Sequence, residues 1–502
     1  MRPHTELLPA FGDNPAMVDP PAYETDSPVD AFAKHLLPWL VAVAFFMQAL
    51  DTTILNTAIP AIAQALDVAP LSMKAVMASY TLSLAVFIPV SGWMADRFGT
   101  RRVFAAAIGV FTFASMLCGF ARNIHWLVAF RILQGAGGAM MLPVGRLTLV
   151  RTFAKSELVR AMSFVAIPGL VGPMLGPVAG GLIIHYFHWS MIFFLNIPIG
   201  LLGLYLVRHH LPDFRKAKVH RLDFTGFVLF GAGIALLSYV LEVFGEHFLS
   251  AREIAALLAL SFVLLGGYRF HSVRMKFPLL RLALFRTRTF FASVAGGFVT
   301  RLGVGGIPFL LPLLYQVGLG MTPVQSGLLM MPQALAAMSL KPFAPRILTR
   351  LGYRGVLVAN TLGLGIVILA FATVDIGTPL WLIVAQAFCF GVCTSMQYTS
   401  MNTLAYADIS AEDSSGASTI SSTAQQLSIS FGVAFASLLA ALFVPDRFTS
   451  SPAGMIHGIH LALLVLGVMT LISTVVFTRL RADDGNAVSQ HKADLPALRP
   501  IE

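Results

Sequence analysis

One carboxylate lies in the middle of a segment that is otherwise uncharged. Asp51 is the only charged residue between Leu36 and Ile62. An ionised Asp at bilayer depth costs about 2.5–3.5 kcal/mol on insertion scales, so such residues usually face a bundle interior, where they pair, bind or carry protons. On a helix, Gln48, Asp51, Thr52 and Asn56 fall within one face. Asp51 therefore either only hydrogen-bonds to a neighbouring helix or takes part in function.

The composition is that of a polytopic helical membrane protein. Of the 502 residues, 57% are hydrophobic and only 12% are charged, and the mean hydropathy is +0.78. This is more apolar material than a soluble protein could cover with its surface. The net charge of +10 could suggest nucleic acid, but the basic residues lie between apolar runs and not on one exposed face. A nucleic-acid partner is therefore excluded.

The Cys and His residues do not form a metal-binding pattern. Cys118, Cys389 and Cys393 lie inside apolar runs without a CxxC pair or a nearby His, which favours packing over a disulfide or a metal site. His185 and His188 are three apart but have no third ligand, so we expect them at the surface. We expect no metal and no catalytic residues, because no HExxH or GxSxG pattern occurs in the apolar runs.

Fourteen apolar runs have about the twenty residues that a helix needs to cross a bilayer. They lie near residues 36–60, 73–94, 103–121, 126–148, 161–184, 189–207, 224–244, 253–270, 290–315, 324–345, 355–374, 380–401, 417–444 and 457–478. Lys and Arg are concentrated in the loops on one side, which predicts that this side and both termini are cytoplasmic. One cytoplasmic loop, Asp408 to Ser415, is instead acidic, with Asp408, Glu412 and Asp413.

The chain contains a weak internal repeat. The second run is followed by Arg97-Phe98-Gly99-Thr100-Arg101 and the tenth by Arg350-Leu351-Gly352-Tyr353-Arg354. If the first six runs match the last six, the seventh and eighth are an inserted pair, and two six-helix halves surround a central path, as in many secondary transporters. We therefore expect a disordered cytoplasmic tail over 1–35, an N-terminal half over 36–207, a linker with two inserted helices over 208–289, a C-terminal half over 290–480 and a second disordered cytoplasmic tail over 481–502.

The link between the second and third runs is rich in charge. It reads Gly92-Trp93-Met94-Ala95-Asp96-Arg97-Phe98-Gly99-Thr100-Arg101-Arg102 and resembles motif A of the major facilitator superfamily. The resemblance implies a gating latch made of Gly92, Asp96, Arg97, Gly99 and Arg101. In that latch the Asp lies against the cytoplasmic start of the thirteenth helix, where an anion is favoured, and holds this side closed. The acidic loop would then supply a partner for Arg97, Arg101 or Arg102. A basic anchor with a turn would explain the arginines but not Asp96.

The fourth run contains an arginine at bilayer depth. The stretch Phe130-Arg131-Ile132-Leu133-Gln134-Gly135-Ala136-Gly137-Gly138 resembles motif B of the same family. Arg131 cannot lose its charge, so it needs an anionic or carbonyl partner inside the bundle, and Asp51 is the natural candidate. The pair could be a proton-coupling site or a purely structural ion pair, because a buried pair is weak evidence of function.

The fifth run is unusually rich in Gly and Pro. The stretch from Pro168 to Gly181 has a GPxxGPxxGG pattern made of Gly172, Pro173, Gly176, Pro177, Gly180 and Gly181. Such residues permit a bend and very close helix contact, which generic small-residue packing would also use. The pattern resembles motif C, which marks antiporters within the superfamily.

These motifs together resemble the fourteen-span drug:proton antiporters of the EmrB/QacA type. The run Leu50–Pro60 is similar to the first-helix motif of that branch, and Phe193–Gly200 also resembles it. The runs Gly137–Thr148, Pro168–Gly181 and Arg286–Phe290 look closest to the MdtD/HsrA-like subgroup. The resemblance covers roughly residues 36–480. It implies an all-α polytopic membrane protein with the major facilitator fold, fourteen transmembrane helices and no cofactor other than a proton gradient.

The substrate cavity is expected to be lined by polar and soft side chains from both halves. The candidates are Gln48, Asn56, Gln134, Arg301, Tyr315, Met331 and Gln333. Arg301 lies near the repeat equivalent of the first run, so it either faces the cavity or only hydrogen-bonds another helix. Some relatives that export dications carry an extra acid in the tenth run, which here reads Met330-Met331-Pro332-Gln333. Lipophilic neutral or singly charged substrates fit better.

The expected function is proton-driven efflux of lipophilic small molecules or drugs across a bacterial cytoplasmic (inner) membrane by alternating access. Asp51 would carry the proton, and its protonation would change the relative free energies of the inward and outward states. A uniporter or specific metabolite exporter of the same fold is the alternative. A periplasmic adaptor on the outer loops is a further partner that the sequence neither requires nor excludes. A membrane-embedded enzyme is disfavoured because the apolar runs contain no catalytic motif. A sensor or scaffold is disfavoured because it would need a long soluble domain.

Overall fold

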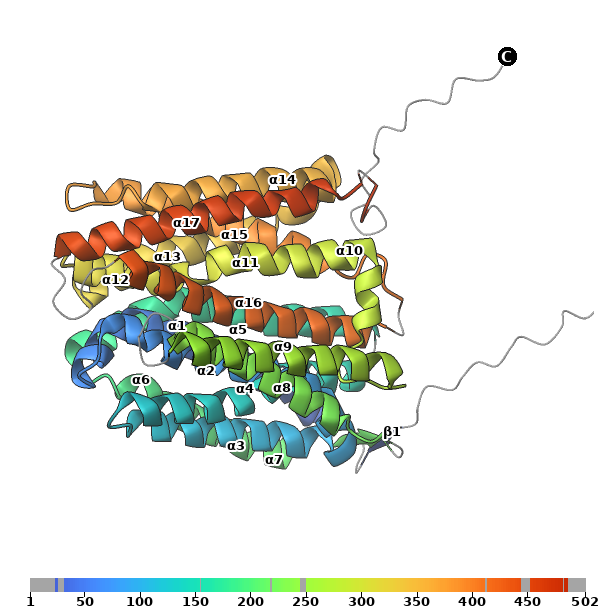
Figure 1. The fold of residues 1–502 in the computed structure, drawn as a ribbon. Helices are drawn as coiled ribbons and strands as arrows, with labels where there is room; N and C mark the ends of the chain where they lie inside the picture. Colours follow the sequence, from blue (N-terminus) through green and yellow to red (C-terminus); the bar gives the residue numbers. More distant parts are fainter. Residues whose placement is uncertain are drawn as a thin grey trace, which may run out of the picture.

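The computed structural model describes residues 23–25, 31–153, 155–216, 219–243, 250–410, 413–443, 452–481 and 483–485. Within these ranges the chain is a bundle of long, roughly parallel helices (Figure 1). Twelve described helices are long and apolar enough to cross a membrane, and the two other expected spans fall on α5, whose apolar part Val171–Tyr186 is shorter, and on α13. The predicted all-α polytopic fold is therefore confirmed.

The described residues of the first part of the chain form seven α-helices, one strand and one 3₁₀ turn. They are β1 (Tyr23–Thr25), α1 (Ala31–Ala65), the 3₁₀ turn η1 (Pro70–Met73), α2 (Lys74–Phe98), α3 (Thr100–Gly119), α4 (Ile124–Thr152), α5 (Lys155–Tyr186), α6 (Met191–Phe194) and α7 (Asn196–His210). Helix α1 packs on α5, while α4 packs on both α2 and α3. Strand β2 (Phe214–Lys216), α8 (Phe224–Val243), α9 (Ala251–Arg274) and the 3₁₀ turn η2 (Leu282–Arg286) follow.

The last part of the chain begins with one span built from several pieces. These are α10 (Arg288–Phe291), the π-helix η3 (Ala292–Gly296), α11 (Gly297–Gly305), α12 (Ile307–Leu313) and the π-helix η4 (Leu314–Gly318). The helices α13 (Pro323–Leu340), α14 (Ala344–Phe371), α15 (Leu380–Leu404), α16 (Ser414–Phe443) and α17 (Pro452–Thr478) complete the bundle. Helix α14 packs on α17 and α15, and α13 packs on α15.

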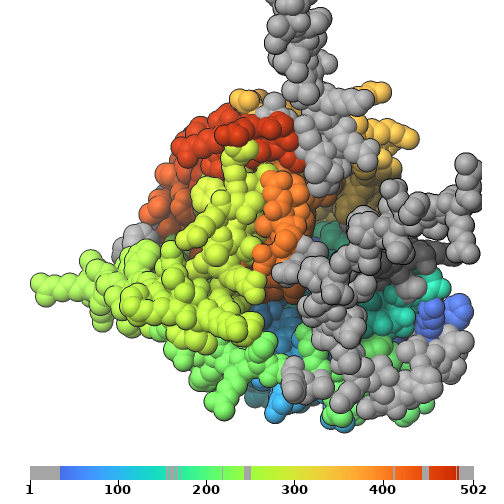
Figure 2. Space-filling model, turned by 90° about the vertical axis from the view of Figure 1, so that its right-hand side faces the viewer, coloured from blue at the N-terminus to red at the C-terminus, as the bar shows by residue number. Residues whose placement is uncertain are grey.

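The two groups of helices meet along two seams, α5 against α13 and α2 against α16. Helices α8 and α9 pack on each other, and α8 also packs against α2 and α16. We call the end of the bundle that carries β2 and the starts of α3, α10 and α16 the basic end, because Arg101, Arg215 and Arg281 lie there. Viewed onto this end, the start of α16 (orange) lies beside the segment that follows α9 (yellow-green) (Figure 2).

Two short segments in the predicted disordered tails are ordered. Tyr23–Thr25 forms strand β1, which pairs antiparallel with β2, with Tyr23 opposite Lys216. Asp484 forms an ion pair with Arg288 at the start of α10. Both segments have partners at the basic end, and these partners could not be predicted from the composition of the tails.

The internal repeat appears in the backbone. Gly99 separates α2 from α3 with a φ of 96°, and Gly352 kinks α14 with a φ of 66°. Both glycines occupy the left-handed region, which side chains with a Cβ rarely adopt. The shared RxGxR sequence therefore makes the same kind of turn in each half.

Candidate functional site

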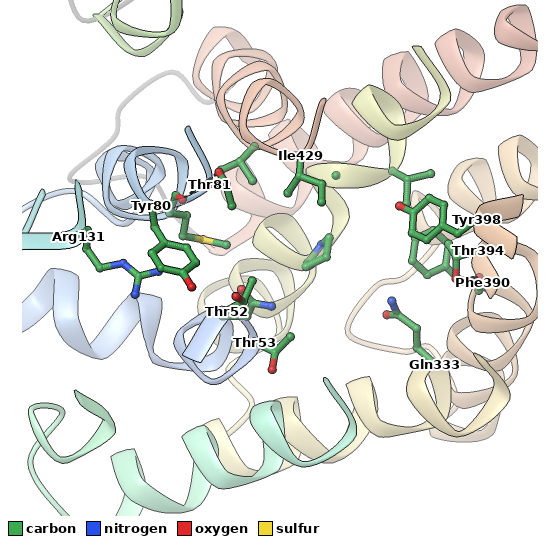
Figure 3. Close-up of a pocket in the computed structure, with 16 residues that line it drawn as sticks. Thr52, Thr53, Tyr80, Thr81, Arg131, Gln333, Phe390, Thr394, Tyr398 and Ile429 are labelled. Carbon is green, nitrogen blue, oxygen red and sulfur yellow. Dashed lines mark hydrogen bonds between the residues drawn. The ribbon is translucent and has the colours of Figure 1, made fainter. Parts of the chain in front are cut away.

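A cavity of about 220 Å³ lies between the two groups of helices, near the middle of the bundle. In Figure 3, Arg131, Tyr80, Thr52 and Thr53 stand on one side, while Gln333, Phe390, Thr394 and Tyr398 stand on the other. Its further lining residues are Asn56, Met77, Thr81, Val304, Gly305, Pro308, Ile429 and Val433. We call this the central cavity. None of its lining residues is acidic.

Asp51 lies beside the central cavity inside a cage of donors. Its side chain is 2% exposed. The Nη1 of Arg131 donates to Asp51 Oδ2 at 2.6 Å. The Nε2 of Gln134 donates to Oδ1 at 2.8 Å, and the Nδ2 of Asn196 donates to the same oxygen at 3.1 Å. Because all three contacts are donors to carboxylate oxygens, the arrangement suits the ionised form of Asp51.

Helix α4 supplies both Arg131 and Gln134, which are three residues apart and so lie on one face. Arg131 Nη1 also donates to Gln134 Oε1 at 2.8 Å, and the guanidinium lies 4.1 Å from the centre of the Tyr80 ring. The helix can come this close to α2 because Gly135 has no side chain: a Cβ there would lie 2.6 Å from the carbonyl oxygen of Tyr80. The glycines of this stretch thus set the depth of Arg131.

The predicted contact between Asp51 and Arg131 is present, but the cage has a member that the sequence analysis did not single out. Asn196, at the start of α7, also donates to Ser115 Oγ at 3.0 Å and so joins α7, α3 and α1. It is the only amide in the apolar run Phe193–Gly200, a signal of the same kind as Asp51 in α1. Only the packing of α7 on α1 shows that the partner of Asn196 is Asp51.

The predicted cavity residues divide into three groups. Asn56 and Gln333 line the central cavity, and Gln48 lines a second cavity described below. Arg301 lines neither cavity, but it contacts Tyr398 of the central cavity and Asn402 of the second. The other three predicted residues also differ from the structure.

Gln134, Tyr315 and Met331 line neither cavity. The side chain of Gln134 is fully buried because it bridges Arg131 and Asp51. Tyr315 is fully buried within an apolar cluster at the end of α12. Met331 is half-buried on α13. Helical spacing placed these residues near the path, but it could not tell an inner face from a face that packs on a neighbouring helix.

A larger cavity of about 1050 Å³ occupies the basic end. Residues of both groups of helices line it, including Gln48 of α1, Asp96 of α2, Arg146 of α4, Asn402 of α15 and Ser415 of α16. We call it the basic-end cavity. On α1 and on α15, residues one helical turn apart line the two cavities in succession: Gln48 and Thr52, then Asn402 and Tyr398. The two cavities therefore lie next to each other along these helices, with the basic-end cavity nearer the basic end.

The predicted latch is not closed in this structure. Asp96 forms ion pairs with Arg151 of α4 and with Lys216 of β2, the latter at 2.7 Å, and not with α16. Asp213 caps the start of α3 by accepting from the backbone N–H of Arg101 at 2.9 Å, and it lies 3.8 Å from Arg102 Nε. The reason is geometric, since the basic-end cavity separates Asp96 from Ser415.

The rest of the latch prediction is likewise altered. Gly92 lines the basic-end cavity, and Gly99 makes the turn where a Cβ would lie 2.3 Å from Asp213 Oδ1. In the acidic loop, Asp413 pairs with Arg281, while Asp408 accepts a hydrogen bond from Thr289 Oγ1 at 2.7 Å. Glu412 lies outside the described residues. Among the described residues of this loop, Asp408 and Asp413 therefore do not pair with the motif A arginines in this conformation.

Motif C forms a tight seal toward the opposite end. A Cβ at Gly172 would lie 2.7 Å from the Cβ of Ala49, and one at Gly176 only 2.1 Å from Thr53 Oγ1. The corresponding distances are 2.3 Å from Gly180 to the Ile54 carbonyl oxygen and 2.5 Å from Gly181 to that of Pro323. The missing side chains therefore let α5 approach α1 and α13 very closely, with the backbone of Ile54 and of Pro323 directly against it.

Carbonyl groups of motif C accept hydrogen bonds from threonines of α1. Thr57 Oγ1 donates to the Pro177 carbonyl at 3.1 Å, and Thr53 Oγ1 donates to the Gly172 carbonyl at 3.4 Å. Gln316 of η4 donates to the Thr57 carbonyl at 2.9 Å. On the second seam, Ser437 Oγ of α16 donates to the Leu71 carbonyl at 3.1 Å. Together these contacts close the opposite end.

The inserted pair α8–α9 is anchored at the basic end by Asp223. This carboxylate accepts from the backbone N–H groups of Gly226 at 2.8 Å and Leu279 at 3.1 Å, and His271 Nε2 lies 2.7 Å away. Burial alone would raise the pKa of Asp223, but these hydrogen bonds outweigh it and lower the pKa below its usual value. The site ties both ends of the inserted pair together.

No group of three or more His, Cys, Asp or Glu side chains that could hold a metal ion occurs among the described residues. His188 instead lies 3.0 Å from Ser190 Oγ in the turn before α6. Cys118 is buried near Gln134, and Cys389 is exposed on α15. The chemistry of the site thus lies in one acid, its donors and the two cavities.

Comparison with known proteins agrees with this architecture. The Major Facilitator Superfamily matches residues 41–433 and 296–500. Two relatives carry the provisional name multidrug resistance protein MdtD. That of Serratia proteamaculans is 39% identical over 447 residues, which cover 89% of this chain and 93% of the relative. That of Escherichia fergusonii is 40% identical over 461 residues, which cover 90% and 97%.

Solved structures share the fold at low identity. A D-xylose-proton symporter has a TM-score of 0.64 at 13% identity and covers 90% of this chain and 99% of its own. A bacterial homologue of the lysosomal transporter Spinster, in an inward-facing and unoccupied conformation, has a TM-score of 0.63 at 12% identity and covers 93% and 100%. These neighbours are transporters and not enzymes. On the family match and the relatives at about 40% identity, the chain belongs to the major facilitator superfamily.

Proposed function

We propose that this transporter exports lipophilic small molecules or drugs across the bacterial cytoplasmic (inner) membrane in exchange for protons. The basic end and both termini would face the cytoplasm, as the distribution of Lys and Arg predicts. The relatives named as multidrug resistance proteins support export of this kind. The conformation described here would then be the inward-facing one, because the large cavity lies at the basic end and the opposite end is sealed.

The observation that carries the proposal is the caged carboxylate of Asp51. Its three donors stabilise the ionised form, and Arg131 reaches from Asp51 to the wall of the central cavity. Protonation of Asp51 would weaken the ion pair and leave the buried Arg131 charge without its counter-ion. An uncompensated buried charge costs several kcal/mol, so the molecule would favour whichever arrangement of helices hydrates or pairs that charge better.

The mechanism that follows is alternating access. A substrate would reach the central cavity from the basic end while Asp51 is ionised. Opening of the opposite seal would release the substrate, and a proton taken up by Asp51 from that side would favour the return. Proton binding and substrate binding would then be linked through Arg131, which contacts Asp51 and lines the central cavity. No cofactor other than the proton gradient is required by this scheme.

The lining of the central cavity suits lipophilic substrates. Met77, Val304, Phe390 and Val433 supply apolar surface from four helices, and Met is able to adapt to different shapes. The lining lacks acidic residues, so it offers no counter-charge to a dication. Asn56, Thr394 and Gln333 add hydrogen-bonding groups that would orient a bound molecule.

The proposal is tested in proteoliposomes loaded with a lipophilic fluorescent dye. For the wild type, an imposed pH gradient should drive dye movement several-fold faster than the same gradient collapsed with an uncoupler. Asp51→Asn should abolish that difference, while Asp375→Asn, which removes an exposed acid at the opposite end, should preserve it. Gradient-driven transport that persists fully in Asp51→Asn would refute the role of Asp51. Dye movement that ignores the gradient in the wild type would favour a uniporter or metabolite exporter.

A further inference from the structure

Arg301 is a deeply buried cation whose charge nothing in the mechanism above uses. It lies on α11 and is 4% exposed. Its Nη2 donates to Asn402 Oδ1 at 3.1 Å, and its guanidinium lies 5.1 Å from the centre of the Tyr398 ring. Its Nε is buried without a hydrogen-bond partner. In the described part of the chain, no carboxylate forms an ion pair with it.

The contrast with Arg131 shows what is missing. Arg131 is equally buried, but Asp51 compensates its charge directly. Arginine does not deprotonate in proteins, so Arg301 cannot escape the cost of burial by becoming neutral. One neutral amide oxygen and an aromatic ring provide only part of the stabilisation that a carboxylate would give. The site therefore has unused capacity to bind an anion.

Arg301 is not part of either cavity lining, but it lies directly behind residues that line both cavities. Of its two contacts on α15, Tyr398 lines the central cavity and Asn402 lines the basic-end cavity. Gly297 leaves room for the guanidinium, because a Cβ there would lie 3.0 Å from Arg301 Nη1. A second cation, Arg146, lines the basic-end cavity and stacks on Phe45 at 5.4 Å, with no ion pair to a described carboxylate. Two arginines without a described carboxylate partner thus lie beside the cavities: Arg146 at the basic-end cavity and Arg301 behind Tyr398 and Asn402.

We propose that Arg301, with Asn402 and Tyr398, forms a subsite for the acidic group of the substrate, so that the exported class includes lipophilic organic acids. This inference rests on the proposed export function, for which it names a substrate class. A carboxylate would accept from the free Nε and from one Nη of Arg301, while the apolar remainder of the molecule would occupy the central cavity. Exchange of a monoanion outward for a proton inward would also be driven by a membrane potential that is negative inside.

The subsite is tested by binding, without any gradient, to the purified full-length protein. The probes are 1-naphthylacetate and 1-naphthylacetamide, which share a ring system but differ in charge at neutral pH. We expect the wild type to bind the carboxylate about tenfold more tightly than the amide, a ratio that corresponds to about 1.4 kcal/mol. Arg301→Gln should bind both probes equally, and Arg301→Lys should retain part of the preference. Arg346→Gln, which removes an exposed charge outside both cavities, should behave as the wild type.

Each outcome decides the question. Retained binding of the amide by Arg301→Gln shows that this variant is folded, so loss of the carboxylate preference there supports the subsite. Equal binding of both probes by the wild type, binding of neither, or a preference that survives Arg301→Gln overturns it and leaves Arg301 as a helix-to-helix hydrogen-bonding residue. Because the assay uses no gradient, these results are independent of whether Asp51 couples transport to protons.

Discussion

The two seams between the halves differ sharply from one end of the bundle to the other. At the opposite end, α5 meets α13 backbone against backbone at Gly181, where a Cβ would lie 2.5 Å from the Pro323 carbonyl oxygen. At the basic end, a cavity of about 1050 Å³ separates Asp96 on α2 from Ser415 on α16. One end is closed by small residues that leave no space, and the other is open and lined by charges that find partners within their own half.

This difference teaches how the molecule could change its access. The glycine contacts contain no ion pair, so the helices can separate there as rigid bodies. An added side chain would prevent them from packing together again. A charged mouth closes only when its ions exchange partners. Asp96, now held by Arg151 and Lys216, would have to leave them to reach the start of α16. Closure thus depends on close packing at one end and on ion pairs at the other. A single substitution can therefore affect one end without affecting the other.

The largest effect is expected at the glycine seal. In Gly181→Leu, the new Cβ would lie 2.5 Å from the carbonyl oxygen of Pro323 at the start of α13, across the seam between the halves, and this oxygen is backbone and cannot rotate away. Overpacking costs about 1–3 kcal/mol, enough to disfavour the closed seal by about fivefold or more. Transport in proteoliposomes should fall by at least that factor, with normal membrane insertion. Gly266→Leu adds the same side chain to α9 where nothing lies within 4 Å and should transport normally. Equal rates in the two variants would contradict the seal.

A smaller effect is expected at the charged mouth. Asp96→Asn removes the partner of Arg151 and Lys216, so it should destabilise the open basic end and also prevent the latch from forming when that end closes. We expect transport to slow by several-fold, measured as initial rates at equal protein density. Lys216→Met removes one of the two partners and should have a weaker effect. A wild-type rate in Asp96→Asn would show that this carboxylate only anchors the loop.

The smallest effect is expected at Asp223, which lies at the mouth but belongs to the inserted pair. Because its folded-state pKa is lowered, its contribution to stability is present above the ordinary Asp pKa of about 3.9 and is lost as the pH falls through the lowered value. Asp223→Asn should reduce the stability by on the order of 1 kcal/mol at pH 7. Thermal unfolding of the two proteins should converge below about pH 4. A difference that does not change with pH would rule out ionisation as its source.

Sequence reasoning reached the site where chemistry limits the choices, and failed where packing or conformation decides. Asp51 and Arg131 could be paired in advance, because a buried arginine needs an anion and α1 offers one. Asn196 could not, since its role depends on α7 packing against α1. The turn at Gly99 could be predicted from the RxGxR sequence, and it recurs at Gly352. The partner of Asp96 could not be predicted, because it depends on which end of the molecule is open.

The role of Asp51 as the proton carrier is tested most directly by measuring protons. Purified protein in weakly buffered detergent solution is first brought to a pH at which Asp51 has taken up its proton. Addition of a transported substrate should then release close to one proton per protein in the wild type, and none in Asp51→Asn with substrate binding retained. Proton release from Asp51→Asn equal to that of the wild type would contradict the account.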